Sequence, residues 1–334
     1  MTKTQKLKNY YSNGKLLLTG EYLVLDGAKS LAVPTKFGQD LIIDKIKELQ
    51  LIWASFTNKG ECWFESVFDL QKLRLVNCTF NSGKEGSAEF IAETLLDILK
   101  EAKRLNPDFL NSETGFVVKT QLTFPRNWGL GSSSTLINSI ASWAKVDAFQ
   151  LLWNSFKGSG YDIACAQNDS PIFYQIDNKK PIIRQVEFNP NFKENLFFVH
   201  LNQKQDSKEG IAKFRERGSN FDKEIVRISQ ISDEFIKVDS LESFNKLIVE
   251  HEQVISSIIK LKPIKENLFP DYFGAIKSLG AWGGDFVLAT GNEETPSYFK
   301  NKGFETILKY SEMIKPTLIL PKGGNSSANK IVKK

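Results

Sequence analysis

The sequence predicts an α+β protein with two domains, on three observations. The chain has 334 residues, which is enough for two hydrophobic cores. Hydrophobic residues make up 41% and charged residues 25%, as in an ordinary globular protein. Strand-like runs prevail in the first half and helix-like runs in the second, with a change of composition near Asn189. We therefore expect an N-terminal domain over 1–189, a C-terminal domain over 190–322 and a mobile tail over 323–334.

The first half is expected to mix strands with amphipathic helices. Short runs rich in branched and aromatic residues are typical of strands. Such runs occur at Asp40–Asp44, Leu49–Phe56, Gly115–Phe124, Pro171–Ile176 and Ile182–Phe188. Apolar residues recur at helical spacing over Ser87–Arg104 and again over Thr135–Lys145, which predicts two helices that each bury one face.

The second half is expected to be a smaller α+β unit. A strand is predicted at Leu196–Leu201, and the long stretch Lys208–Lys260 reads as helical almost throughout. The remaining expected elements are a short helix at Tyr272–Leu279, strands at Phe286–Ala289 and Thr317–Leu320, and a helix around Ser297–Tyr310.

Cysteine usage and hydropathy indicate a cytoplasmic protein. The three cysteines, Cys62, Cys78 and Cys165, are scattered and match neither a metal-ligand spacing nor a disulfide framework. Free cysteines of this kind are most simply explained by a reducing compartment. No apolar run is long enough to cross a bilayer, and the polar start of the chain does not resemble a secretory signal. We therefore expect no membrane association.

Charge and histidine content exclude several kinds of chemistry. The net charge of +5 is spread along the chain without basic blocks, which argues against a nucleic-acid partner. It would suit a small anionic substrate, although a solvated lysine-rich surface is the simpler explanation of this charge. The two histidines, His200 and His251, lie in no motif, so a Ser-His-Asp triad or a zinc-histidine site is not expected.

The most informative segment is the glycine-serine stretch that runs from Pro125 to Ser134. It follows a predicted strand and opens a predicted helix, with two glycines before three serines. Glycines let the backbone turn tightly around a ligand, and the first N–H groups of a helix have no internal partner and lie at the positive end of its dipole. Phosphate is the expected ligand, although a plain N-capped helix after a glycine turn would have the same sequence pattern.

Three further segments accompany this stretch. They are Asn13 to Tyr22, Gly158 to Ala164 and Lys277 to Asp285, and two of them carry a candidate side chain, Lys15 and Asp162. Each has an ordinary structural explanation when it stands alone: a solvated lysine, an aspartate that caps a helix, and a glycine turn between a helix and a strand.

In this order and separation, the four segments resemble the GHMP kinases, the family of galactokinase, homoserine kinase, mevalonate kinase and phosphomevalonate kinase. The resemblance covers Asn13 to about Thr290, with the tightest match at the loop from Gly129 to Ser134. It implies the two-domain GHMP kinase fold, in which the N-terminal domain is like domain 2 of ribosomal protein S5 and the C-terminal domain is a ferredoxin-like α/β unit.

The resemblance also implies roles for individual residues. Asp162 would be the base that accepts the substrate proton, and Lys15 would keep Asp162 ionised and offset charge on the moving phosphoryl group. Ser133 would meet Mg²⁺. The ATP phosphates would be wrapped by Gly129, Leu130, Gly131, Ser132, Ser133 and Ser134. The residues expected near substrate or phosphates are Glu21, Ser159, Gly160, Gly280, Ala281, Gly283 and Gly284.

Details of the motifs favour the mevalonate-pathway branch of the family. The Ser-Gly-Tyr-Asp turn keeps the aspartate that homoserine kinase lacks, and Gly20-Glu21-Tyr22 is more similar to phosphomevalonate kinase than to mevalonate kinase. The implied activity is transfer of the γ-phosphate of ATP to mevalonate or phosphomevalonate, with Mg²⁺, and the choice between the two acceptors stays open. The oligomeric state stays open as well.

Two departures from the family pattern motivate alternatives. The stretch Gln150–Phe156, where mevalonate kinase carries a metal-binding glutamate, has no acidic residue, and Asp147 is the nearest carboxylate. Trp282 replaces a glycine of the last motif. One alternative is a non-catalytic, nucleotide-binding homologue. A second is an enzyme like diphosphomevalonate decarboxylase.

Overall fold

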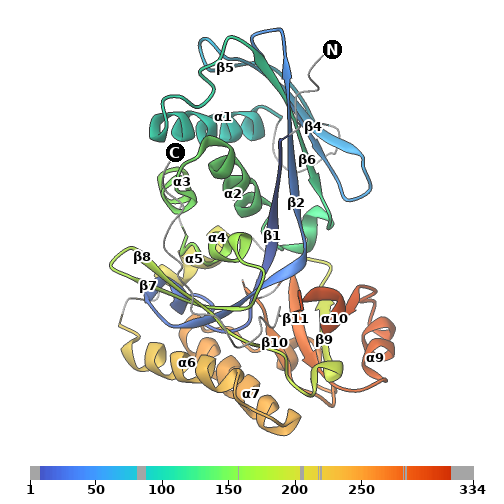
Figure 1. Cartoon of the computed structure of the whole chain (residues 1–334). Helices are drawn as coiled ribbons and strands as arrows, with labels where there is room; N and C mark the ends of the chain where they lie inside the picture. The colour runs from blue at the N-terminus through green and yellow to red at the C-terminus, as the bar shows by residue number, and fades with distance from the viewer. Residues whose placement is uncertain are drawn as a thin grey trace, which may run out of the picture.

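The computed structural model describes residues 8–80, 88–156, 158–203, 207–216, 218, 220–280, 282 and 284–316. Two β-sheets form its framework, and helices cover them (Figure 1). None of the helices in this described part has the length and apolar character needed to span a bilayer.

The larger sheet belongs to the first half of the chain. Its strands run in the order β5-β4-β3-β6-β2-β7-β8, and β1 pairs with β2. The strands are β1 (Lys8–Leu17), β2 (Ser30–Ile46), β3 (Gln50–Phe56), β4 (Cys62–Asp69), β5 (Arg74–Phe80), β6 (Gly115–Leu122), β7 (Ile172–Asp177) and β8 (Lys180–Gln185). Strand β2 is 17 residues long and pairs with β6 near one end and with β7 near the other. It therefore runs from the upper part of the molecule to its middle (Figure 1).

Four helices accompany this sheet. They are α1 (Ala88–Leu105), α2 (Ser132–Ala144), α3 (Ala148–Ser155) and α4 (Tyr161–Gln167). Three of them pack directly against its strands, whereas α3 packs on the other helices. Helix α1 contacts strand β5, and Leu95 and Leu99 of its apolar stripe lie in the same buried cluster as Trp53 and Phe68 of the sheet. Burial of each such side chain contributes about 1.5–3 kcal/mol, so the apolar spacing that predicted this helix also fixes its place on the sheet.

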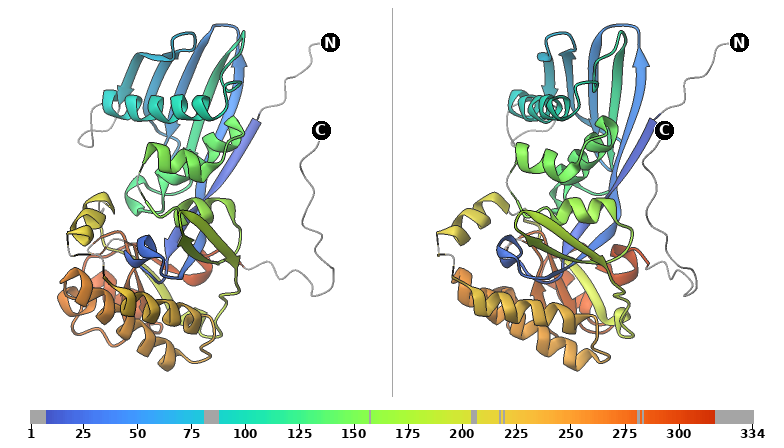
Figure 2. Two further views of the ribbon diagram at one scale, coloured as in Figure 1. Left: turned by 90° about the vertical axis from the view of Figure 1, so that its left-hand side faces the viewer. Right: turned by 60° about the vertical axis from the view of Figure 1, so that its left-hand side comes forward.

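The smaller sheet holds the second half together. It is antiparallel in the order β10-β11-β9-β12. Its strands are β9 (Leu196–His200), β10 (Ile276–Ser278), β11 (Phe286–Thr290) and β12 (Ile307–Lys309). The helices of this half are α5 (Ser207–Arg215), α6 (Asp222–Phe235), α7 (Leu241–Ile259), α8 (Ile264–Leu268), α9 (Thr295–Asn301) and α10 (Tyr310–Met313). Figure 2 shows α6 and α7 side by side at the end of the molecule away from α1.

The two halves share a hydrophobic cluster. Leu16, Leu31 and Phe124 from the first half lie in the same buried cluster as Phe198 and Phe286 from the second. The chain also returns to the first sheet after α10, where Ile314 forms a bridge with Thr35. The boundary after residue 189 stays a prediction, and the tail 323–334 and the strand expected at 317–320 lie outside the described residues.

One expected helix was wrong and another was too long. The stretch Tyr272–Leu279 contains strand β10, because Gly274 lets its backbone come so close to the carbonyl of Thr290 that a Cβ there would overlap it. The helix expected over Ser297–Tyr310 ends at Asn301, where Gly303 with a φ of +87° turns the chain into β12. Strands β4 and β5 were not predicted.

Candidate active site

The glycine-serine segment forms a tight loop between β6 and α2. Gly129 and Gly131 have φ values of +65° and +91°, in the left-handed region that other residues rarely enter. A Cβ on Gly131 would lie 2.7 Å from Oγ of Ser134 and 3.2 Å from Cγ of Lys15. Both conformation and space therefore require glycine at position 131.

The three serines form the first turn of α2. The Ser133 side chain is exposed, whereas Ser134 is buried and donates its hydroxyl to the Gly131 carbonyl at 2.9 Å. The opening turn of a helix presents N–H groups without helical partners at the positive end of the dipole. The loop thus has the backbone shape and polarity of a phosphate site.

Lys15 lies directly against this loop. Strand β1 is irregular between Asn13 and Lys15, and the N–H of Lys15 donates to the Leu130 carbonyl at 3.0 Å. Its Nζ donates to the Gly129 carbonyl at 2.9 Å. The structure therefore joins the first motif to the glycine-serine loop, although more than 100 residues separate them in sequence.

Asp162 faces the same place from the first turn of α4. Burial raises the pKa of this carboxyl, although the charge of Lys15 and a hydrogen bond from the Ile163 N–H oppose the rise. Desolvation would lower the pKa of Lys15, but Tyr161, Asp285 and Asp162 outweigh it, so the pKa is raised. Lys15 and Asp162 thus adjust each other's proton affinity at the edge of the loop.

The turn before α4 is closely packed. Gly160 has a φ of +91°, and a Cβ there would lie 3.0 Å from the Phe149 ring. The Tyr174 hydroxyl donates to the Ser159 carbonyl from β7. Ser159 and Gly160 therefore fix the start of α4, which holds Asp162 in place.

Asp147 takes no part in this site. It caps α3, where its side chain accepts hydrogen bonds from the N–H groups of Phe149 and Gln150 at 2.7 and 3.0 Å. The carboxylate nearest in sequence to the missing glutamate is thus a structural cap.

Glu21 is fully buried in a polar cluster that joins the two halves. Its carboxylate forms an ion pair with Lys277 of β10, and its other oxygen lies 3.2 Å from Nε2 of His251 on α7. That nitrogen accepts the Gly20 N–H at 3.0 Å. The pKa of His251 is held well below its usual value by burial and by Lys277, so the ring is neutral. The cluster holds the Gly20–Glu21 turn against the second half of the chain.

Glu252 completes the cluster. It lies 3.8 Å from Lys277 and accepts the Ser278 hydroxyl at 3.1 Å. Burial, opposed by Lys277 and reinforced by Glu21, raises the pKa of Glu252 to about 8. The neutral form of Glu252 balances the cluster, because a single lysine cannot neutralise two buried carboxylates.

The last glycine turn is partly described. Gly280 has a φ of +72°, and a Cβ added there would meet no atom within 4 Å. Ala281 and Gly283 lie outside the described residues. Gly284 is buried. The Trp282 ring belongs to the shared hydrophobic cluster, and its backbone N–H donates to the Tyr22 hydroxyl at 3.1 Å.

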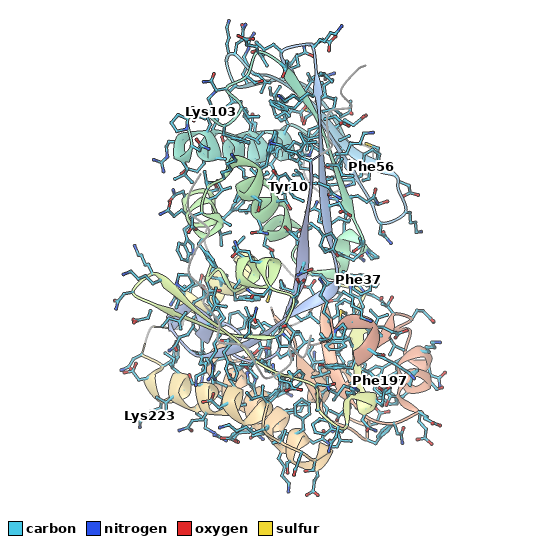
Figure 3. The ribbon with its side chains drawn as sticks, viewed as in Figure 1. Tyr10, Phe37, Phe56, Lys103, Phe197 and Lys223 are labelled. Atoms are coloured by element: carbon cyan, nitrogen blue, oxygen red, sulfur yellow. The ribbon has the colours of Figure 1, made fainter. Side chains whose placement is uncertain are left out.

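Three residues at the loop were not predicted. The Asp285 carboxyl group packs on Gly129, where a Cβ would overlap it. The Trp128 ring lies edge-on to Phe286 at 5.4 Å and to Phe37 at 5.2 Å, and Figure 3 labels Phe37 between the upper and lower parts of the molecule. His200 forms a hydrogen bond of 3.0 Å with the Asn127 carbonyl. Asp285 and Trp128 each stood in a motif without an assigned role, and nothing in the sequence pointed to His200.

Comparison by sequence gives no match, either to a family model or to a curated protein. Comparison of folds gives many. The mevalonate kinase of Methanococcus jannaschii superposes with a TM-score of 0.65 at 18% identity, over 94% of this chain and 100% of that one. The phosphomevalonate kinase of Streptococcus pneumoniae, solved with phosphomevalonate and AMPPNP, gives 0.63 at 15%, over 90% and 99%.

A galactokinase matches nearly as well. The enzyme of Lactococcus lactis, complexed with galactose, gives a TM-score of 0.60 at 13% identity, over 94% of this chain and 96% of that one. The chain therefore has the α+β fold of the GHMP kinases, as the motifs predicted. These similarities do not separate one branch of these kinases from another, since the three TM-scores lie between 0.60 and 0.65.

Proposed function

We propose that this protein is an ATP-dependent small-molecule kinase that transfers the γ-phosphate of ATP to mevalonate or phosphomevalonate. The observation that carries the proposal is the convergence of Lys15 and Asp162 on the loop from Gly129 to Ser134. A phosphate-binding loop beside a lysine and a carboxylate supplies what phosphoryl transfer needs, which is positioning and neutralisation of charge.

The loop would hold the ATP phosphates. Its two left-handed glycines leave room for close approach, and the N–H groups at the start of α2 would donate to phosphate oxygens. No group of three or more His, Cys, Asp or Glu side chains in the described part of the chain could hold a metal. The exposed Ser133 hydroxyl suits Mg²⁺, which usually keeps several waters and takes few protein ligands. Mg²⁺ would neutralise charge between two phosphates.

Asp162 and Lys15 would act on the acceptor side. If the acceptor is an alcohol, Asp162 would orient its hydroxyl and take the proton as the oxygen attacks phosphorus. The raised pKa of Asp162 makes it a better base than an ordinary aspartate. Lys15 would offset the charge on the transferred group. The transfer is direct and in line, without a phosphoenzyme. If the acceptor is a phosphate, Asp162 would serve mainly to organise Lys15.

The acceptor is inferred from details of the motifs. The Gly20-Glu21-Tyr22 turn and the run Gly283-Gly284-Asp285 are similar to phosphomevalonate kinase, and a relative in fold was solved with phosphomevalonate and an ATP analogue. Matches to mevalonate kinase are equally close in fold. Both acceptors therefore belong in the proposal.

A non-catalytic nucleotide-binding protein is the second candidate. Two observations favour it: Asp147 is occupied as a helix cap, and the bulky Trp282 stands where a glycine was expected. The Trp282 ring lies in the hydrophobic cluster, so it is part of the core beneath the last glycine turn.

Release of ADP from Mg-ATP tests the proposal. The acceptors would be mevalonate, phosphomevalonate, homoserine and a few sugars, with mass spectrometry to tell transfer from hydrolysis. The Lys15→Met variant, purified in the same way, controls for contaminating kinases. We expect a phosphorylated product from mevalonate or phosphomevalonate. ATP binding without any phosphorylated product would favour the non-catalytic candidate, and release of carbon dioxide from diphosphomevalonate would reveal a decarboxylase.

A further inference from the structure

Asp285 directly precedes strand β11 and is anchored to the smaller sheet by its backbone. Its N–H donates to the Gln203 carbonyl at 2.7 Å, and its own carbonyl accepts the Leu201 N–H at 2.8 Å. Both partners follow strand β9. The residue is buried, with 8% of its surface exposed. Its position is therefore set by the second half of the chain.

The side chain of Asp285 reaches the glycine-serine loop from Gly129 to Ser134 in the first half of the chain, which is the proposed phosphate loop. Its carboxyl group packs on the Cα of Gly129, so that a Cβ there would overlap the carboxyl carbon and both oxygens. Lys15 donates from Nζ to the carbonyl of the same glycine at 2.9 Å. The negative charge of Asp285 helps to raise the pKa of Lys15. Gly129 is thus the point where Lys15 and Asp285 meet.

The backbone of Asp285 is strained. Its φ is +54°, a left-handed value that costs a non-glycine residue roughly 1 kcal/mol or more. Aspartate and asparagine tolerate this region better than most residues, and glycine enters it without cost. A glycine-rich turn that carries a side chain at its left-handed position indicates that the carboxylate itself is needed.

We propose that Asp285 is a positioning residue that fixes Lys15 and the Gly129 corner of the phosphate loop, and so links the smaller sheet to phosphoryl transfer. The inference rests on the proposed kinase function. The other groups that face Lys15 are Tyr161, Asp162 and Cys165, all from α4. Asp285 supplies the carboxylate from the opposite half of the chain, so Lys15 is held from both halves.

The test compares Asp285→Asn with Asp285→Gly. Asparagine keeps the shape and tolerates the backbone, and glycine relieves the strain, which offsets part of the lost attraction to Lys15, so the unfolding temperatures of both variants should stay close to the wild-type value. We expect kcat to fall about tenfold to a hundredfold in both, with a smaller change in the KM for ATP. Asp169→Asn is the matched control, because Asp169 joins the halves through Lys315 at 2.7 Å; its kcat should stay at the wild-type value.

A second readout does not depend on catalysis. Trace acetylation at fixed pH, mapped by mass spectrometry, reports the reactivity of each lysine. Loss of the Asp285 charge lowers the pKa of Lys15, so Lys15 should react several times faster in Asp285→Asn, relative to the exposed Lys145. If the wild-type protein phosphorylates no acceptor, the proposed function fails. The labelling then decides by itself whether Asp285 positions Lys15.

Three results would overturn the positioning role. One is a kcat in Asp285→Asn within about twofold of wild type. Another is unchanged labelling of Lys15. The third is a parallel loss of kcat and of unfolding temperature, which would mean that Asp285 only stabilises the fold.

Discussion

At the scale of single residues, the site depends on the mutual influence of Lys15 and Asp162. Burial alone would favour the neutral form of each, and each charge stabilises the other. Removal of either one changes the other's protonation as well as its own contribution.

Asp162→Asn tests the proposed base. Asparagine keeps the shape and the hydrogen bond from the Ile163 N–H but cannot take a proton. With an alcohol acceptor we expect kcat to fall about 10²–10⁴-fold, with ATP binding retained. Steady-state kinetics and ATP titration measure the two effects. Full turnover in this variant would remove Asp162 from the role of base.

The acid limb of the pH-rate profile tests the coupling of the two residues. Asp162 must be ionised to act, and its raised pKa places the loss of activity above the range of an ordinary aspartate. Lys15 lowers that pKa, so Lys15→Met should move the limb of kcat/KM to higher pH while it reduces the rate. A limb that stays in place or moves to lower pH contradicts the coupling.

Only some of the residues of the candidate site could be predicted from the sequence. Lys15 and Asp162 stood in recognisable motifs, so both could be named in advance. The roles of His200, His251 and Lys277 depend on which strands and helices meet across the two halves. No local pattern encodes such pairings, because each partner looks ordinary in its own segment.

At the scale of elements, the phosphate loop is the critical piece. It connects strand β6 to helix α2, and its two left-handed glycines bring the helix N-terminus beside Lys15. The sequence predicted this loop well because glycine, proline and serine have strong local preferences. The error at β10 arose because pairing with β11 decided its conformation, which local preference cannot show.

Gly131→Ala tests the loop. The new Cβ would be strained at φ +91° and crowded by Ser134 and Lys15, so we expect ATP affinity to fall at least about tenfold and stability by about 1 kcal/mol or more. Gly303→Ala is the control, since Gly303 has a φ of +87° with no atom within 4 Å of the added Cβ. It should lose stability alone. Equal ATP affinity in the two variants would contradict the assigned role of the loop.

At the scale of the whole molecule, the site lies at the junction of the two halves. The shared hydrophobic cluster and the buried Glu21–Lys277 pair both cross that junction. The sequence could predict an α+β protein with the fold of the GHMP kinases, because the motifs and the apolar spacing are local. It could not predict that Asp285 and His200 of the second half contact the phosphate loop and the residues just before it, because those contacts depend on packing between distant segments.

Glu252→Gln tests the electrostatics of the junction. The folded protein keeps a proton on Glu252 up to about pH 8, whereas the unfolded chain releases it near pH 4.3. Stability should therefore decline as pH rises between these values, by up to about 1.4 kcal/mol per pH unit. Glutamine imitates the protonated form and should flatten the decline, as measured by urea unfolding at about pH 5.5 and about pH 8.

Glu250→Gln is the control for this measurement. Glu250 lies on the same helix, but Arg227 holds its pKa below the usual value, so it is ionised across the whole pH interval. Its substitution should leave the slope unchanged. A wild-type protein whose stability rises with pH across the interval would contradict the proton on Glu252.

A crystal structure with Mg²⁺ and a non-hydrolysable ATP analogue tests most directly whether the motifs form one transfer site. We expect the triphosphate against the backbone of Gly129 to Ser134, with Nζ of Lys15 at hydrogen-bond distance from the terminal phosphate and the Asp162 carboxyl facing it. A triphosphate bound away from this loop, or an Asp162 side chain turned from it, would contradict the assignment.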